Sequence, residues 1–236
     1  MPMKTKQARE SGKRIAERVH AGEIESAYAL LAPVLAERTP FRLLGLIGEA
    51  IGAGPSEPVD AFLNRIASER TEGGWVVIGC ALGQQLGHAP ASAFARCREF
   101  IAAADIWYGS DILGERVPGP ALLVNFQPAL TLLAPWREDE NAWVRRAVGV
   151  AAHFWAKRTR GARSVEAENL LAFLEPMFEE WEMDVVKGVG WGLKTLGRYY
   201  PALMADWLPR QIERPHRALM LRKARTYLAD EFQTPR

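Results

Sequence analysis

The chain has 236 residues, of which 48% are hydrophobic and 25% are charged, and these proportions exclude a chain that is disordered throughout. At about 100–200 residues per domain, the length allows one domain or two small ones. Thirty Lys and Arg stand against twenty-eight Asp and Glu, a net charge of +2. This excludes a strongly basic nucleic-acid-binding arm, so any basic surface must be local.

The predicted elements are helices throughout. Ala, Leu, Arg and Glu recur at spacings of three and four, whereas Val, Ile and Thr rarely alternate with polar residues. Short breaks such as Gly52–Pro55 carry their own stop signals, and the longest irregular stretch is expected at 157–163, a basic turn. The helices are expected, in chain order, at about 4–20, 25–38, 41–52, 57–68, 74–86, 90–103, 105–115, 120–134, 141–158, 164–180, 183–199 and 202–229, the last with a break near Pro215.

This run of short helices with short connections predicts an all-α fold. A compact bundle and a solenoid of stacked helix pairs are the two alternatives. About a dozen helices fit the solenoid better, because one bundle core cannot accommodate so many. No strict sequence repeat is visible, so the repeats would be degenerate. Such a solenoid has a concave surface that usually binds something large.

The number of cysteines and the length of the apolar runs exclude several classes of protein. Cys80 and Cys97 are too few for a disulfide framework or a four-ligand zinc site, and we expect both to be inert core thiols. The N-terminal residues lack a signal-peptide apolar region, and no run approaches the ~20 residues of a membrane span. We therefore expect a soluble, cytoplasmic protein. Three acids, expected to be solvated, are Glu179, Glu180 and Glu182.

The helix expected at 183–199 separates two faces at 100° per residue. Its apolar face, expected in the core, carries Val186, Val189, Leu193 and Leu196. Its opposite face carries Lys187, Trp191, Lys194 and Arg198. A Trp among cations is either a partly exposed residue packed along Lys and Arg stems, or an aromatic platform in a basic groove that suits an anionic polymer.

The helix expected at 141–158 shows the same division. Its buried face is predicted to carry Trp143, Ala147, Val150, Ala151 and Phe154. Its other face carries Arg146, Gly149, His153 and Lys157, and continues into Arg158, Arg160 and Arg163. Small residues near that face, such as Gly149, would let a partner approach the backbone; the alternative is a solvated charged face. His153 has no second His or Cys at ligand spacing, so we expect no metal there.

The helix expected at 105–115 pairs a Trp with an acid. Trp107 and Asp111 are four residues apart and therefore neighbours on one face. We expect Asp105 to be the N-cap of this helix, and Asp111 to lie beyond the first turn, where capping does not explain it.

Taken in order, these motifs resemble the DNA alkylation-repair glycosylases of the AlkD type. The resemblance lies in Trp107–Asp111, in Arg146 within Trp143–Ala147, and in Trp191 within Lys187–Leu193, and it covers about residues 100–225. The sequence departs from the family pattern at Tyr108, where an acid is common. The resemblance implies a right-handed solenoid of about six HEAT-like antiparallel helix pairs with a concave basic cleft, as one domain over 1–236.

The resemblance also implies roles for individual residues. Trp107 and Trp191 would be aromatic walls beside the damaged nucleotide, Asp111 the catalytic carboxylate, and Arg146 a phosphate clamp. The implied partner is duplex DNA carrying alkylated bases, bound by a monomer without cofactor, metal or obligate protein partner. The residues expected to bind DNA are Arg145, His153, Lys157, Arg158, Lys187, Lys194, Arg198, Arg222 and Lys223.

The implied reaction is the excision of cationic N3- or N7-alkylated purines, such as 3-methyladenine and 7-methylguanine, in base-excision repair. Such a base is already a good leaving group and needs no general acid, so a carboxylate need only stabilise the oxocarbenium-like sugar and orient water. An aromatic face attracts the cationic base. The alternatives are a non-catalytic DNA-binding module that recognises distorted or branched DNA, and a protein–protein scaffold.

The distribution of charge supports a nucleic-acid partner despite the near-neutral total. Residues 184–236 contain ten Lys and Arg against five Asp and Glu, an excess of +5, and the remaining 183 residues therefore sum to −3. The basic surface is expected in this C-terminal part.

Overall fold

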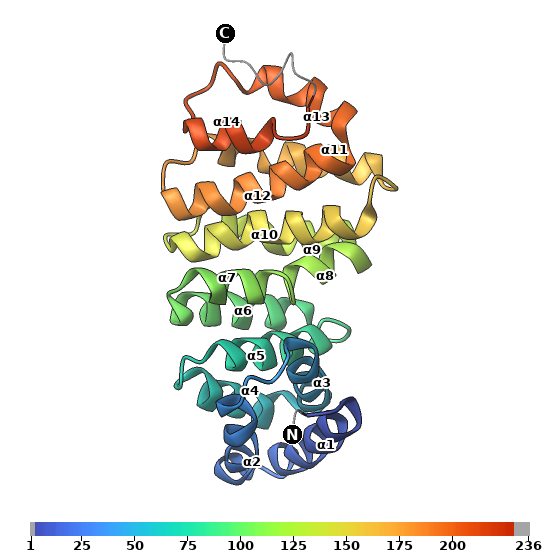
Figure 1. Cartoon of the computed structure of the whole chain (residues 1–236), viewed down its shortest axis with the longest axis vertical. Coiled ribbons are helices and arrows are strands. Elements are labelled where there is room, and N and C mark those ends of the chain that lie inside the picture. The colour runs from blue at the N-terminus through green and yellow to red at the C-terminus, as the bar shows by residue number, and fades with distance from the viewer. Residues whose placement is uncertain (1–2, 229–236) are drawn as a thin grey trace. The chain divides into compact units, whose positions relative to one another are not determined.

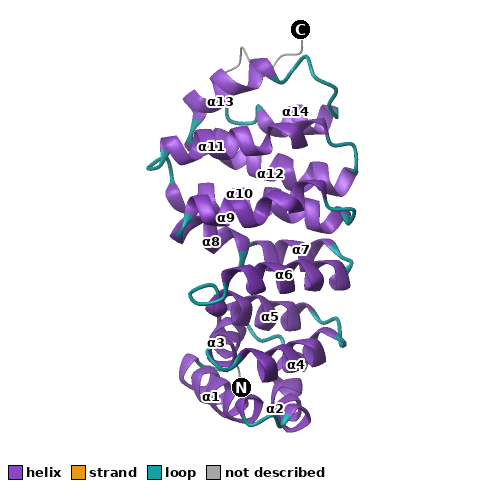
Figure 2. Cartoon of the chain, turned by 180° about the vertical axis from the view of Figure 1, so that it is seen from behind, coloured by secondary structure: helices purple, strands orange, loops and turns teal. Residues whose placement is uncertain are grey.

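The computed structural model describes residues 3–228, and every regular element in that range is a helix (Figure 2). The predicted all-α class is thereby confirmed. The chain divides into two compact units, Met1–Val117 (unit 1) and Pro118–Arg236 (unit 2), which are described separately. The single domain, and the right-handed solenoid with its concave cleft, stay predictions. Within 3–228, no helix combines the length and apolarity that a membrane span requires.

Unit 1 is built from two layers of helices (Figure 1). In one layer α1, α3, α5 and α7 are successive neighbours, and in the other α2 contacts α4, which contacts α6. Consecutive helices thus alternate between layers, as in stacked helix pairs. The helices are α1 (Thr5–His20), α2 (Ile24–Ala36), α3 (Phe41–Gly52), α4 (Ser56–Ala67), α5 (Glu72–Gln85), α6 (Pro90–Ala104) and α7 (Trp107–Gly114).

Unit 2 repeats this alternation. In one layer α8 contacts α10, α10 contacts α12, and α12 contacts α14; α11 and α13 pack together in the other (Figure 1). The α-helices are α8 (Pro118–Val124), α9 (Phe126–Leu133), α10 (Ala142–Thr159), α11 (Ser164–Leu174), α12 (Met183–Tyr199), α13 (Pro201–Trp207) and α14 (Ala218–Ala224). Three short 3₁₀ helices are η1 (Ala134–Glu138), η2 (Glu175–Glu179) and η3 (Leu208–Arg210).

Three long helices predicted in unit 2 are wrong in their extent. The helix expected at 120–134 is two helices separated at Asn125, where the backbone leaves the helical region with φ −145° and ψ 80°. The helices expected at 164–180 and 202–229 tighten into 3₁₀ turns that begin directly before a proline. The break expected near Pro215 is confirmed, since it lies between η3 and α14, and residue 229 lies outside the described residues. The irregular stretch expected at 157–163 is shorter than predicted, since α10 continues to Thr159, and a longer one separates η3 from α14.

Glycines allow α10 and α12 to pack backbone against backbone. A Cβ on Gly149 would lie 2.3 Å from the carbonyl group of Gly188, and one on Gly192 would lie 2.6 Å from the Gly149 oxygen. Such distances exclude any larger residue without movement of a helix. The close partner that the small residues of α10 accommodate is therefore α12 of the same chain.

Candidate functional site

The Trp107–Asp111 pair stands on α7 of unit 1. The prediction that Asp105 caps this helix is wrong: Asp105 ends α6 in the left-handed region, with φ 49°, and Ile106 is the N-cap residue of α7. Arg70 supports this turn, because its guanidinium donates hydrogen bonds to the carbonyl oxygens at the end of α6, 2.9 and 3.2 Å away. Asp111 therefore lies in the second turn of α7.

Trp107 opens α7 and is one of the most exposed large apolar side chains of unit 1. Its exposed fraction is 55%, whereas Asp111, one turn later, is half-buried. The indole meets the ring of Tyr108 edge-on, with centroids 5.7 Å apart and planes at 84°. Trp107 and Asp111 thus lie one helical turn apart on α7, as the spacing of these two residues predicted.

In unit 2, the structure places Arg146 differently from the prediction. Its side chain is buried, with an exposed fraction of 7%, and its Nη1 donates a hydrogen bond to the carbonyl oxygen of Asp184, 3.0 Å away. The aliphatic stem also packs on Gly188. The expectation that Arg146 lies on an open face of α10 is therefore wrong, because α12 covers that face. Its role as a phosphate clamp stays a prediction.

His153 and Trp191 form a stacked pair between α10 and α12. Their ring centroids are 3.7 Å apart and the planes are inclined by 23°. His153 was predicted to face solvent, but it is buried, with an exposed fraction of 6%. Trp191 is half-buried. The stack covers one face of the indole, so that a ligand ring can reach only the other face.

Thr195 contacts both residues of this pair and bears on which nitrogen of His153 carries the proton. Its hydroxyl donates a hydrogen bond to the Trp191 carbonyl oxygen (2.9 Å) and lies 2.7 Å from His153 Nδ1. A hydroxyl has a single proton, so when that proton is directed at the Trp191 carbonyl, Nδ1 is the donor in the second contact. Burial, and then the charge of Lys157, lower the pKa of His153 to about 4. The imidazole is therefore neutral at pH 7 and carries its proton on Nδ1.

A pocket of about 330 Å³ opens beside this stack. Three of its lining side chains are cationic and three are aromatic rings. One of the rings, Tyr227, follows α14 and has an exposed fraction of 44%. We name it the Tyr227 pocket; its lining residues are His153, Lys157, Trp191, Lys194, Thr195, Arg198, Tyr199 and Tyr227.

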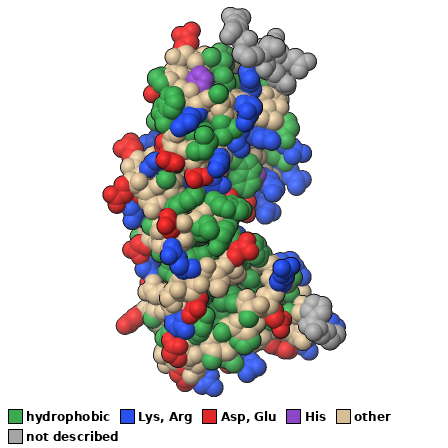
Figure 3. Space-filling view, turned by 60° about the vertical axis from the view of Figure 1, so that its left-hand side comes forward, with side chains coloured by type: hydrophobic (Ala, Val, Ile, Leu, Met, Phe, Trp, Pro, Cys, Tyr) green, Lys and Arg blue, Asp and Glu red, His purple; other side chains and the backbone are tan. Residues whose placement is uncertain are grey.

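A second group of cations lies next to this pocket, where Lys and Arg side chains gather on unit 2 (Figure 3). Burial lowers the pKa of Lys223, and the neighbouring charges of Lys194, Arg146, Arg222 and Lys187 lower it further. Like charges close enough to oppose one another's protonation create a positive potential that an anion relieves. Asp184, 2.9 Å from Lys187 Nζ, is an acid that pairs with this group.

Arg145 is less available to a ligand than predicted. Its Nε lies 2.9 Å from Glu180, and its Nη1 donates a hydrogen bond to the carbonyl oxygen of Asp139 at 2.7 Å. Burial alone would raise the pKa of Glu180, but the Glu182 backbone N–H, together with Arg145, lowers it overall. Glu180 therefore belongs to a paired network rather than to a freely solvated acidic cluster.

Unit 2 thus brings together most of the residues that were expected to bind DNA. The Tyr227 pocket contains four of them, and the neighbouring group adds Lys187, Arg222 and Lys223. Arg158 belongs to neither group, and its guanidinium lies over the ring of Phe154 at 4.9 Å. The prediction missed three pocket residues. Of these, Thr195 is one turn beyond Trp191 and could have been found from spacing, whereas Tyr199 and Tyr227 carry no local signal.

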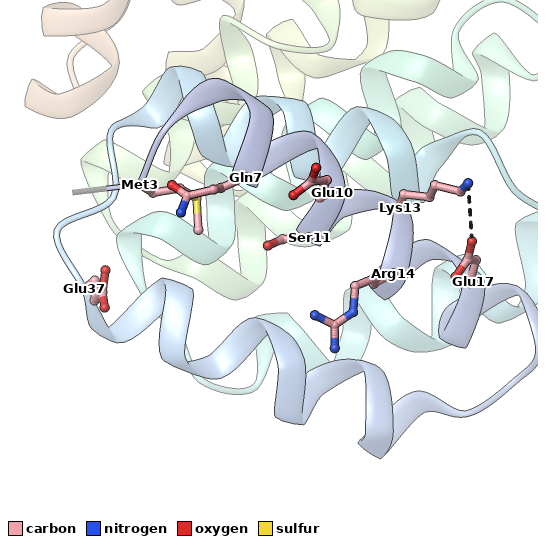
Figure 4. A pocket seen from close by; sticks show the side chains of 8 residues that line it. All are labelled: Met3, Gln7, Glu10, Ser11, Lys13, Arg14, Glu17 and Glu37. Atoms are coloured by element: carbon pink, nitrogen blue, oxygen red, sulfur yellow. Dashed lines mark ion pairs between the residues drawn. The ribbon is translucent and has the colours of Figure 1, made fainter. Parts of the chain in front are cut away.

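A metal site and the larger cavity of unit 1 were the alternatives to the Tyr227 pocket. Residues 3–228 hold no group of three or more His, Cys, Asp or Glu able to bind a metal. A cavity of about 630 Å³ lies against α1 in unit 1 (Figure 4). Both acids and bases line it, and none of the predicted site residues does. The lining residues are Met3, Gln7, Glu10, Ser11, Lys13, Arg14, Glu17 and Glu37.

An all-helical protein with a surface Trp–Asp pair and a basic, aromatic-lined pocket is a protein suited to binding an anionic polymer. Residues 63–228 match the model of the DNA alkylation repair enzyme family, and the chain belongs to this family. No curated protein is similar enough to count as a match.

Among solved structures, the chain is similar to the Pseudomonas fluorescens alkylpurine DNA glycosylase AlkC bound to DNA containing an abasic site analog. The two are 19% identical with a TM-score of 0.49, over 92% of this chain and 62% of that chain. This chain thus corresponds to less than two thirds of that protein's length.

Proposed function

We propose that this chain is an AlkD-type DNA glycosylase that releases cationic N3- and N7-alkylated purines from duplex DNA. The observation that carries the proposal is the Trp107–Asp111 pair, one helical turn apart and presented on α7, in a chain of the DNA alkylation repair enzyme family. The proposal assigns the reaction to a monomer in the cytoplasm, without cofactor or metal and with DNA as its partner.

In this proposal the carboxylate of Asp111 supplies the chemistry. The alkylated purine carries a positive charge that is lost when the glycosidic bond breaks, so the base leaves without a proton donor. The bond electrons go to the base, and the sugar becomes an oxocarbenium-like cation. Asp111 stabilises that cation and accepts a proton from the water that attacks it. The face of Trp107 attracts the cationic base before the bond breaks.

The second element of the proposal is phosphate binding by unit 2. Lys187, Lys194, Arg222 and Lys223 form a cationic group in which the charges oppose one another, and DNA phosphates would relieve this opposition. Trp191 would offer its open face as an aromatic wall, while its other face rests on His153. Specificity for cationic bases then comes from ring faces and from the carboxylate, and requires no reading of base edges.

The proposal is tested by measuring the release of 7-methylguanine from methylated duplex DNA. Asp111→Asn keeps the size of the side chain and removes its charge, so DNA affinity is expected to change little while release falls about 100-fold or more. Asp206→Asn, on the exposed surface of α13, is the matched control and is expected to retain full release. Unchanged release by Asp111→Asn overturns the catalytic assignment. DNA binding with no release by the wild type supports a non-catalytic module instead.

A further inference from the structure

The Tyr227 pocket combines positive charge with aromatic rings. Lys157, Lys194 and Arg198 give it three positive charges, and none of its eight lining residues is acidic. Trp191, Tyr199 and Tyr227 add three aromatic rings. Cations alone suit any anion, whereas cations interleaved with rings suit a ligand that has both a phosphate and a flat base.

Distances within the pocket leave the Tyr227 ring available. Lys194 Nζ lies 5.6 Å from the ring centroid and the Arg198 guanidinium carbon 5.7 Å from it. Both are close to the limit of about 6 Å for a cation–π contact. In unit 1, by contrast, the guanidinium of Arg65 rests on Tyr28 at 3.7 Å, which is full stacking contact. The cations of the pocket therefore flank the Tyr227 ring without covering it as Arg65 covers Tyr28.

Trp191 contributes to the pocket in a different way. Because His153 occupies one face of its indole at 3.7 Å, Trp191 is held by α10 and cannot rotate freely. The hydroxyl of Thr195 donates its proton to the Trp191 carbonyl, so it offers no donor to a ligand. The side-chain donors in the pocket that suit an anion are the three cations, the two tyrosine hydroxyls and the indole N–H of Trp191.

We propose that the Tyr227 pocket binds one unpaired nucleotide, with its phosphate between Lys194 and Arg198 and its base on the ring of Tyr227. The volume of about 330 Å³ matches the lower end of small-molecule sites, which suits one nucleotide. Tyr227 is then a binding residue contributed by the segment after α14. The inference rests on the proposed function only where it names a DNA strand as the source of the nucleotide. A free nucleotide offers the same phosphate and base to the pocket.

Calorimetric titration of the full chain with three probes tests the inference. dAMP is expected to bind at least about tenfold more tightly than either inorganic phosphate or deoxyadenosine, because only dAMP engages both cations and ring. Tyr227→Ala should remove this advantage and Tyr227→Phe should retain most of it. Tyr28→Ala, which removes a ring already covered by an arginine, is the matched control and should leave dAMP binding unchanged.

A second comparison distinguishes the two sources of the nucleotide. Wild-type chain is titrated with a fully paired duplex and with the same duplex carrying one unpaired adenine. A preference of about tenfold for the unpaired adenine that Tyr227→Ala abolishes supports a nucleotide of a DNA strand. Tight dAMP binding without that preference supports a free nucleotide in the same pocket.

Two results overturn the inference: equal binding of dAMP and phosphate, or a dAMP affinity that Tyr227→Ala leaves unchanged. Base release from methylated duplex is measured on the same samples. If the wild type binds dAMP as expected but releases no base, the result counts against the proposed function alone. If it releases the base but does not bind dAMP as expected, the result counts against the pocket alone.

Discussion

The imidazole ring of His153 lies almost parallel to the indole ring of Trp191, with 3.7 Å between their centroids. Thr195 links the two residues, since its hydroxyl accepts a hydrogen bond from His153 Nδ1 and donates one to the carbonyl oxygen of Trp191. The orientation of the indole therefore depends on a neutral residue of the neighbouring helix. His153 contributes to the predicted DNA surface by holding an aromatic wall and not by adding a charge.

Removal of this support is expected to weaken DNA binding through Trp191. His153→Ala leaves the indole without its stacking partner, and affinity for duplex DNA should fall about threefold to tenfold, in line with about 0.5–1.5 kcal/mol for an aromatic pair. His153→Phe keeps a ring in the stack and should recover most of the affinity. Fluorescence anisotropy at fixed salt measures both. If His153→Phe binds DNA as weakly as His153→Ala, ring stacking on Trp191 does not contribute to DNA affinity.

The buried His153 also predicts how stability depends on pH. Its pKa is lowered to about 4 by burial and by Lys157, below the ordinary value of 6.5 that the unfolded chain has. Between these two values the unfolded chain binds a proton that the folded chain excludes, so stability falls as the pH falls through this window and is unaffected above it. At pH 5 the expected loss is about 2 kcal/mol relative to pH 7.5.

Urea unfolding at pH 7.5 and pH 5 measures this contribution. Carboxylates contribute to the same change, so the wild type is compared with His153→Phe, in which the carboxylates are intact and the imidazole is absent. The wild type should lose about 2 kcal/mol more than the variant between the two pH values. An equal loss in both proteins would mean that the imidazole is not desolvated in the folded state.

Glycine packing between α10 and α12 makes Gly149 a sensitive position. A methyl group there would lie 2.3 Å from the backbone of Gly188, so Gly149→Ala must push the helices apart and should destabilise the protein by about 2 kcal/mol or more. A methyl group on Gly87 would meet no atom within 4 Å, and Gly87→Ala should be neutral or stabilising by up to about 1 kcal/mol. Thermal unfolding of the two variants provides the comparison. Equal melting temperatures would contradict the close contact.

Helical periodicity predicted one face of α12 correctly and misassigned the polar face of α10. The apolar stripe of α12 is fully buried, as expected from its spacing. On α10, however, Arg146 and His153 are buried, whereas Trp143 and Phe154, expected in the core, are half-buried. The reason is that α10 has α8 on one side and α12 on the other, and a helix with two neighbours in its layer has two covered faces. A helical wheel assumes one covered face.

Contacts between distant segments account for the residues that the sequence could not reveal. Tyr227 meets Lys194 and Arg198 only because the chain after α14 returns to α12. Arg145 was expected to be available to DNA, yet it pairs with Glu180, thirty-five residues later. Residue spacing within one helix predicts neither of these two long-range contacts. The Trp107–Asp111 pair was predictable because both residues lie within one turn of the same helix.

Arg145 and Lys194 are expected to respond differently to removal of charge. Lys194→Gln removes a cation of the proposed phosphate-binding group, so the slope of log affinity for DNA against log salt should become less steep by about 1. Arg145→Gln breaks a largely buried ion pair with Glu180 and should instead lower stability, by about 1–3 kcal/mol, with little effect on the slope. Salt titrations and urea unfolding of both variants separate the two roles. A reduced slope in Arg145→Gln would show that its ion pair opens to bind DNA.

Trp107 and Trp181 offer a matched comparison, because both indoles have an exposed fraction of 55%. Replacing either with Ala should destabilise the protein to a similar extent, by about 1–3 kcal/mol, since each indole buries slightly less than half of its surface. Base release should fall about threefold to thirtyfold in Trp107→Ala, because the cationic base loses a ring face worth about 0.5–2 kcal/mol, and should fall less in Trp107→Phe. In Trp181→Ala, where the lost ring lies 5.3 Å from the guanidinium of Arg217, release should stay at the wild-type rate. Single-turnover release of 7-methylguanine measures all three, and an equal reduction in Trp181→Ala would mean that exposed rings act by general DNA contact and not by facing the damaged base.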